Sequence, residues 1–201
     1  MNFRYYMLNK PSGYITACHD ATQPTVMDLL PQEIAEGLHP VGRLDIDTCG
    51  LLLLTDDGQL DHAILQPKHH IEKTYCITGV GVLSNDTIEQ LTNGVPLEQT
   101  GEVTRPARIT IVRTCTVSDI SEYLPPKRKE RYLKNPDGAA FLAELTICEG
   151  RRHQVKRMLR AVGCRVCHLE RIAIGDVQLD INLPRGGYRP LTDIEIDLIK
   201  R

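Results

Sequence analysis

The stretch HPVGRLDIDTCGLLLLTDDG, residues 39–58, decides how the rest of the chain is interpreted. Four consecutive leucines, residues 51–54, stand between Gly50 and a polar turn, which predicts a short buried strand. Asp45 and Asp47 precede that strand in a segment too short and too rich in glycine for a helix. We therefore expect a loop held against a core strand, a setting that suits a reactive carboxylate. Taken alone, the residues favour the plainer interpretation that both acids are solvated turn residues.

The composition limits the kinds of protein to which this chain can belong. The 201 residues, 41% of them hydrophobic, suffice for one full-sized domain, and with no Trp and two Phe its core must be built from Leu, Ile and Val. The net charge of −2 argues against a protein dedicated to coating nucleic acid. The seven cysteines are scattered, and neither a secretion signal nor an apolar run of membrane-spanning length is present. We expect a soluble, cytoplasmic protein with reduced thiols.

Hydrophobic periodicity gives the expected elements. It predicts strands at 3–8, 14–17, 39–42, 51–55, 71–78, 104–116, 140–148, 164–174 and 177–179, and helices at 24–30, 56–65, 85–93, 151–162 and 192–199. Strands dominate, and they show little regular alternation with helices. This favours a single α+β domain over residues 1–201 with a mostly antiparallel sheet. Residues 118–138 are polar, basic and interrupted by proline, which predicts an exposed loop insertion.

Positive charge gathers in the last third of the chain. Residues 151–171 hold, against the single acid Glu170, the cations Arg151, Arg152, Lys156, Arg157, Arg160, Arg165 and Arg171. In a slightly acidic protein this concentration predicts a phosphate-binding surface, with Lys156 at the border of the apolar helix face. The insertion could extend that surface with Lys127, Arg128, Lys129, Arg131 and Lys134. A solvated helix face is the alternative for one basic helix and is less favoured for two basic segments.

Other reactive patterns are weaker. Cys164, Cys167 and His168 form half a zinc motif without a second pair, which favours buried, inert thiols. The acids Asp56 and Asp57 are better explained as a helix cap than as magnesium ligands. His62, His69 and His70 are typical of surface histidines. No phosphate-cradling loop, dinucleotide fingerprint or nucleophile elbow is present. The remaining candidates for a functional site are a carboxylate, a tyrosine on a neighbouring strand and a group of cations.

Three motifs together resemble those of a known enzyme family. They are Gly42-Arg43-Leu44-Asp45 with Asp47-Thr48-x-Gly50, then Glu72-Lys73-Thr74-Tyr75, and finally Glu149-Gly150-Arg151-x-His153-Gln154-Val155-Lys156-Arg157-Met158. Residues 7–14 and 169–175 supply further matches. In order and spacing these resemble the core motifs of pseudouridine synthases of the RsuA/RluB/RluE/RluF family. The resemblance covers the chain from about residue 5 to residue 191.

The resemblance implies an α+β catalytic domain with a central mixed, mainly antiparallel sheet. It implies conversion of a specific uridine to pseudouridine in ribosomal RNA, without metal or organic cofactor. Asp45 would attack or assist at the sugar, because a carboxylate can trap a developing cation and leave again. Tyr75 would stack on the flipped uracil, near the proton lost from carbon 5. Lys156 would pair with Asp45 and favour its charged form.

The resemblance also implies how RNA is held. Leu169 would pack beneath the base, and the remaining candidate RNA-binding residues are Arg43, Lys73, Arg151, Arg152, His153, Gln154, Arg157 and Arg171. The expected partner is ribosomal RNA, naked or in an assembly intermediate, bound by a monomer with no membrane contact. Flipping one nucleotide out of its stack costs only a few kcal/mol, so the pocket can be reached.

Two features of the chain differ from the usual pattern of the family, and two alternative functions remain open. Members of the family often carry a small N-terminal RNA-binding domain, whereas this chain begins at the catalytic domain, and Met1 favours a natural start. The insertion resembles RluE-type large-subunit enzymes, but segments 39–50 and 67–75 look closer to small-subunit enzymes, so the subunit and the uridine stay open. A non-catalytic rRNA-binding or ribosome-assembly protein would need only the basic surface. A glycosidase would need a second acid, a role for which Asp47 is the available candidate.

Overall fold

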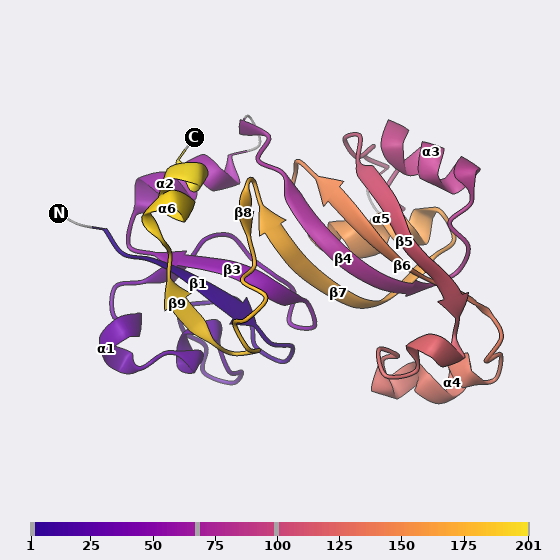
Figure 1. Ribbon diagram of the computed structural model, residues 1–201, viewed down its shortest axis with the longest axis horizontal. Coiled ribbons are helices and arrows are strands. Elements are labelled where there is room, and N and C mark those ends of the chain that lie inside the picture. Colours follow the sequence, from indigo (N-terminus) through magenta and orange to yellow (C-terminus); the bar gives the residue numbers. More distant parts are fainter. Residues whose placement is uncertain (1–2, 67–68, 99–100, 201) are drawn as a thin grey trace. The chain divides into compact units, whose positions relative to one another are not determined.

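The computed structural model describes residues 3–66, 69–98 and 101–200, and its elements are labelled in Figure 1. The chain divides into two compact units. The first unit comprises Met1–Lys73 and Glu170–Arg201, and the second comprises Thr74–Leu169. The prediction of one domain over 1–201 stays a prediction. Pro67 and Lys68, which begin the expected segment 67–75, lie outside the described residues.

The first unit is built on four hydrogen-bonded strands in the order β7-β3-β1-β9, with β2 added to β3 and β8 to β7. These strands are β1 (Tyr5–Lys10), β2 (His39–Pro40), β3 (Cys49–Thr55), the end of β7 (Arg165–Ile174), β8 (Val177–Gln178) and β9 (Tyr188–Pro190). Its helices are η1 (Val26–Leu29), α1 (Gln32–Ala35), α2 (Gly58–Leu65) and α6 (Asp193–Ile199). Among the strand pairs described in this unit only β3–β7 is parallel, and the isolated bridge between Ile15 and Thr25 is parallel as well.

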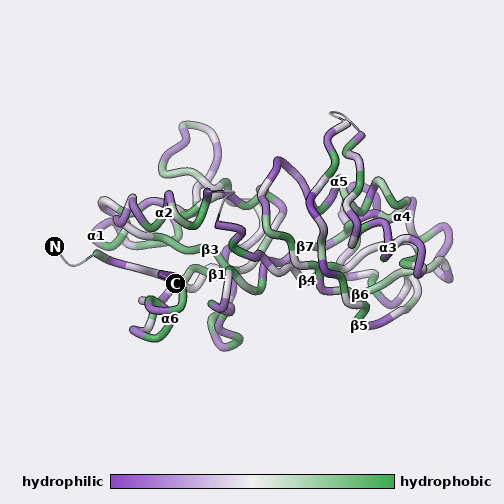
Figure 2. Tube along the Cα trace, turned by 90° about the horizontal axis from the view of Figure 1, so that it is seen from above, coloured by the Kyte–Doolittle hydropathy of each residue, from purple (hydrophilic) through white to green (hydrophobic). Residues whose placement is uncertain are grey.

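The leucine run forms the centre of the first unit, as the sequence predicts. All seven residues of β3 are buried, and the hydrophobic colour of this strand can be followed in Figure 2. Gly50 has a φ of 96°, and a Cβ there would overlap the backbone oxygen of Arg171 on β7. Only glycine therefore permits the close approach of β3 to β7 directly after the Asp45 loop. Met7, Leu51, Leu53 and Ile64 belong to the core around it.

The second unit has the strand order β5-β6-β4-β7. It contains β4 (Lys73–Val80, of which Lys73 belongs to the first unit), β5 (Arg108–Thr116), β6 (Ala139–Ile147) and the start of β7, with helices α3 (Asn85–Asn93) and α5 (Gln154–Ala161). The β5–β6 pair is antiparallel, with an irregularity between Ile111 and Arg113. Alternate residues of β6, including Phe141, Ala143 and Leu145, join residues of α5 in a buried core.

The α+β class and the mixed, mainly antiparallel sheet are confirmed. Helix 85–93 and the Asp57 cap are also confirmed, since the Asp57 side chain accepts from two backbone N–H groups of α2. The predictions for two other segments need correction. Residues 14–17 form only an isolated bridge between Ile15 and Thr25. The helix expected from residue 151 begins at Gln154, because His153 has left-handed backbone dihedrals.

The insertion expected as a loop is instead partly helical. It contains η3 (Ser118–Ile120), η4 (Pro126–Arg128) and α4 (Lys129–Leu133). Its polarity predicts exposure, but the apolar residues spaced through it form a small core together with residues of the adjoining strands. In the part of the chain that the structure describes, no helix is long and apolar enough to cross a membrane.

Candidate functional site

Asp45 lies in the loop between β2 and β3, in the first unit. Backbone hydrogen bonds fix this loop at both ends, from Val41 N to Leu53 O (2.8 Å) and from Thr48 N to Asp45 O (3.0 Å). Its middle is fixed by residues that precede β2, because Gly13 N donates to Ile46 O at 2.8 Å. The loop therefore has a defined backbone, with the Asp45 side chain half-buried and the Asp47 side chain exposed.

A buried lysine holds the same loop from beneath. Lys10, at the end of β1, is 0% exposed. Its Nζ donates to the backbone oxygens of Thr48 (2.9 Å), Pro11 (3.1 Å) and Asp45 (3.2 Å). An ammonium group can be buried only when polar partners replace its water, and here the loop carbonyls do so. A fixed positive charge thus lies under the loop that carries Asp45.

The second unit contains a comparable loop between β6 and α5, organised by a buried carboxylate. Glu149 accepts hydrogen bonds from Arg105 N (3.0 Å) and from Gln154 Nε2 (2.5 Å). It also pairs with Arg151 Nε at 3.2 Å. Arg151 N donates in turn to Gln154 Oε1 at 2.8 Å. These bonds fix the turn that carries Arg152 and His153, whose side chains are exposed.

The turn into α5 is locally strained. His153, the residue before the helix, has a φ of 52°, a conformation that is uncommon for any residue other than glycine. Strain of this kind persists where surrounding contacts determine the backbone, and it is frequent at functional sites. Val155 and Met158 bury one face of α5, and Lys156 beside them is half-buried. The helix therefore presents Lys156 from the border of its apolar face, as the periodicity predicts.

Two more predicted residues lie around the core that α5 covers. Leu169 on β7 is 5% exposed and belongs to the same buried cluster as Val155 and Met158. Tyr75 on β4 is half-buried and packs against this cluster. The second unit thus gathers Tyr75, Leu169 and the helix of Lys156 around one apolar core.

The remaining predicted RNA-binding residues differ in exposure. Arg43, Arg152 and His153 are exposed, Arg157 is half-buried, and Lys73 donates from Nζ to Ile71 O at 2.7 Å. Gln154 is 4% exposed, and its side-chain amide donates a hydrogen bond to Glu149 and accepts one from Arg151 N. Arg171 is likewise 4% exposed, and its Nε donates to Leu51 O at 2.8 Å. For Gln154 and Arg171 an RNA-binding role stays a prediction that these contacts do not support.

The site residues are divided between the units. Asp45, Arg43 and Arg171 belong to the first unit, whereas Tyr75 and Lys156 belong to the second. The predicted pairing of Asp45 with Lys156 joins residues of two units and stays a prediction. The same holds for the stacking of uracil on Tyr75.

Cys164 is buried, as the sequence predicts, whereas Cys167 is only half-buried. Burial raises the pKa of the Cys164 thiol, and it raises the pKa of Cys167 to about 11. Both are free thiols, and at neutral pH both are protonated and poorly nucleophilic. Within residues 3–66, 69–98 and 101–200, no three His, Cys, Asp or Glu side chains gather in a way that would hold a metal ion.

Reasoning from the sequence did not assign a role to Lys10 or to Glu149. Lys10 stands at the end of a strand that begins with hydrophobic residues, which is a signal for a buried cation with a partner elsewhere. Its partners in the Asp45 loop are 35 to 38 positions away, so no local pattern identifies them. Glu149 begins the third motif, but its sequence context does not identify its partners, which extend from Arg105 to Gln154.

Comparison with known proteins agrees with these features. Residues 4–161 match the family model described as RNA pseudouridylate synthase. The chain is 45% identical over 193 residues to Ribosomal small subunit pseudouridine synthase A of Yersinia pestis, an alignment covering 96% of this chain and 71% of that protein. It is 41% identical over 198 residues to YtzG, an uncharacterized RNA pseudouridine synthase of Bacillus subtilis, covering 98% of this chain and 73% of that protein.

The fold agrees as well. The structure superposes on a crystal structure of a pseudouridylate synthase with a TM-score of 0.80 and 39% identity, over 98% of this chain and 74% of that one. The matched family model spans more than half of the chain and includes the Asp45 loop, Tyr75 and helix α5. By fold and by sequence, this chain belongs to the RNA pseudouridylate synthase family, whose members isomerise uridine to pseudouridine.

Proposed function

We propose that this protein isomerises a specific uridine of small-subunit ribosomal RNA, with Asp45 as the catalytic carboxylate. The relatives named as small-subunit synthases support the substrate, since 45% identity extends over 96% of the chain. The loop fixed by Lys10 supports the role of Asp45, because it places a half-buried carboxylate on a defined backbone. A monomer acting in the cytoplasm on ribosomal RNA, naked or partly assembled, completes the proposal.

The chemistry requires one bond to break and one to form. Asp45 attacks carbon 1′ of the ribose or stabilises positive charge there while the bond to uracil N1 breaks. The detached uracil turns so that its carbon 5 bonds to carbon 1′, and the carboxylate departs. The proton on carbon 5 then leaves and N1 gains a proton, so the reaction is a net isomerisation. Tyr75 is the proposed neighbour of that proton, and Lys156 the proposed partner that keeps Asp45 ionised.

Asp45→Asn tests the proposal. One oxygen becomes an NH₂ group in a side chain that is half-buried, so the fold and RNA affinity should change little while turnover is lost. Pseudouridine is mapped in rRNA by carbodiimide labelling and reverse transcription, in cells lacking the gene and in cells complemented with wild type or variant. A stop that returns with wild type and not with Asp45→Asn supports both substrate and residue, and its position identifies the uridine.

Asp47→Asn is the matched control, because Asp47 lies in the same loop with an exposed side chain. It should restore the stop as wild type does. Equal loss of activity in both variants would show that any loop acid is needed and would contradict the specific role of Asp45. Absence of a stop at every small-subunit site would remove that subunit as the substrate. Family membership argues against the non-catalytic alternative.

A further inference from the structure

The insertion between β5 and β6, residues 117–138, is a folded module. Backbone hydrogen bonds close its base, from Val117 N to Gly138 O (2.9 Å) and from Ser118 N to Pro136 O (2.9 Å). Ile120 and Leu124 are buried in a small core together with Val117, and Tyr132 of α4 packs against it. Figure 1 shows the module at one end of β5 and β6. Its backbone is therefore held by its own hydrogen bonds and by packing against the sheet, and we call it the β5–β6 module.

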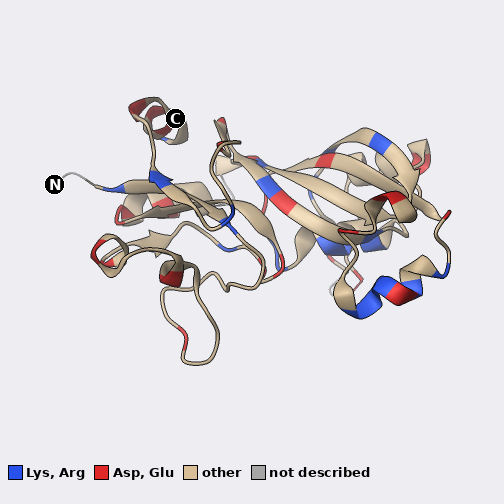
Figure 3. Cartoon of the chain, turned by 60° about the horizontal axis from the view of Figure 1, so that its bottom comes forward, with Lys and Arg blue, Asp and Glu red and all other residues tan. Residues whose placement is uncertain are grey.

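The module carries a concentration of unpaired cations. Residues 126–135 contain the single acid Glu130 and five exposed cations, namely Lys127, Arg128, Lys129, Arg131 and Lys134. Within the described chain none of the five takes part in an ion pair. They form the blue segment around α4 in Figure 3. In a protein of net charge −2, five adjacent cations on a fixed backbone repel one another and favour a polyanion.

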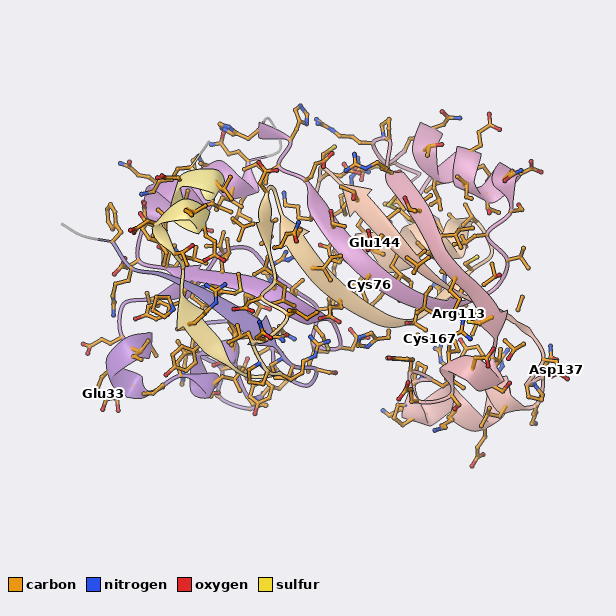
Figure 4. All side chains as sticks on the ribbon, viewed as in Figure 1. Glu33, Cys76, Arg113, Asp137, Glu144 and Cys167 are labelled. Atoms are coloured by element: carbon orange, nitrogen blue, oxygen red, sulfur yellow. The ribbon has the colours of Figure 1, made fainter. Side chains whose placement is uncertain are left out.

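An aromatic contact fastens the module to β7. The rings of Tyr123 and His168 lie 5.3 Å apart at an angle of 45°, and Tyr123 is 39% exposed. Cys167, labelled on β7 in Figure 4, packs against the module's core. His168 directly precedes Leu169, the residue expected beneath the reacting base. Cations next to an exposed aromatic ring are typical of surfaces that bind single-stranded RNA through phosphates and stacking.

We propose that the β5–β6 module is a second RNA-binding element, which contacts phosphates of the substrate RNA away from the reacting uridine. The inference rests on the proposed function for the identity of the RNA, and on the charges and contacts of the module for the binding itself. The occupant is nucleic acid because the surface offers five cations and a partly exposed ring. Its role is affinity, since phosphate contacts position an RNA without taking part in chemistry.

Charge removal on α4 tests this inference. The triple variant Lys129→Gln, Arg131→Gln, Lys134→Gln keeps side-chain length and helix propensity. Its affinity for a protein-free transcript of small-subunit rRNA is measured over a range of salt concentrations. We expect binding to weaken about tenfold at low salt and the slope of log K against log salt to fall in magnitude by about 2, at about 0.7 per phosphate contact. KM should rise in parallel, with kcat unchanged at saturating RNA.

Two control variants test whether RNA affinity follows the net charge of the module. Lys129→Arg, Arg131→Lys, Lys134→Arg retains every charge and should bind like wild type. Glu122→Gln with Glu130→Gln removes two exposed acids of the module and should tighten binding. Circular dichroism and thermal unfolding verify that each variant is folded.

The outcomes separate this inference from the proposed function. Unchanged affinity and salt slope in the folded triple Gln variant would overturn the inference, and would leave an acidic protein surface as the partner to seek. A fall in kcat without a change in affinity would also overturn it. Salt-dependent binding that needs the module, in a protein that makes no pseudouridine in this RNA, would uphold the inference while the proposed function fails.

Discussion

The Asp45 loop of the first unit and the β6–α5 loop of the second are held in opposite ways. A buried cation, Lys10, lies under the loop that carries Asp45 and binds its carbonyl oxygens. A buried anion, Glu149, lies under the loop that carries Arg152 and His153 and binds a backbone N–H and two side chains. Each loop thus presents charge opposite to the charge beneath it.

This difference shows how a loop can be exposed to solvent and still have a defined backbone. A buried ion needs several polar partners, and loop backbones supply them without a helix or strand. Carbonyl groups suit a cation, and N–H groups with an amide suit an anion. The two arrangements differ in strength, because Lys10 is fully buried whereas Glu149 is 9% exposed and also engages Arg151, which reaches solvent. Substitution of Lys10 and of Glu149 tests which of the two contributes more to the free energy of unfolding.

Lys10→Met should have the larger effect. The substitution removes the donor from four backbone carbonyl oxygens and leaves a side chain of similar length, so we expect a loss of about 3–4 kcal/mol in the free energy of unfolding. Denaturant titration measures it. Lys200→Met, which loses a contact with the face of Tyr5, is the control and should cost less than about 1 kcal/mol. Similar losses in the two variants would refute a special role for the buried ammonium group.

Glu149→Gln should have an intermediate effect. The amide keeps an oxygen for Arg105 N but loses the charge that pairs with Arg151 and can no longer accept at both positions. We expect a loss of about 2 kcal/mol in the free energy of unfolding. Glu102→Gln, the control, affects the exposed partner of the same arginine and should change stability by under about 0.5 kcal/mol. An equal loss in both variants would assign the stabilisation to Arg151 alone.

The sequence predicts the Asp45 loop but not the lysine under it, and it places Arg152 and His153 in a helix rather than in the β6–α5 loop. The leucine run and the flanking glycine place the Asp45 loop next to a buried strand, since that pattern is local. Tertiary contacts decide the rest. Lys10 reaches a loop 35 or more positions away, and the start of α5 depends on the left-handed backbone of His153. Arg171 was expected at the RNA surface, but it is buried against Leu51 O, which charge patterning cannot reveal.

The pair of Glu195 and Arg189 at α6 sharpens the comparison, because here both partners are charged and neither holds a loop. Arg189 donates two hydrogen bonds to Glu195 at 2.8 Å and lowers its pKa to about 2. A folded pKa below the ordinary value of 4.5 means that the stabilisation is present above about pH 4.5 and is lost as pH falls toward 2.

After allowance for solvent screening, Glu195→Gln should cost about 1 kcal/mol at pH 7. The difference from wild type should disappear below about pH 2, where the native carboxyl is itself protonated. Unfolding free energies of both proteins across this pH range measure the effect. A difference that is independent of pH would show that the geometry of the Thr192 cap, rather than the charge of Glu195, stabilises α6. In that case a charged pair near the surface contributes less than a single ion buried under a loop, and the contrast between the two kinds of site becomes larger.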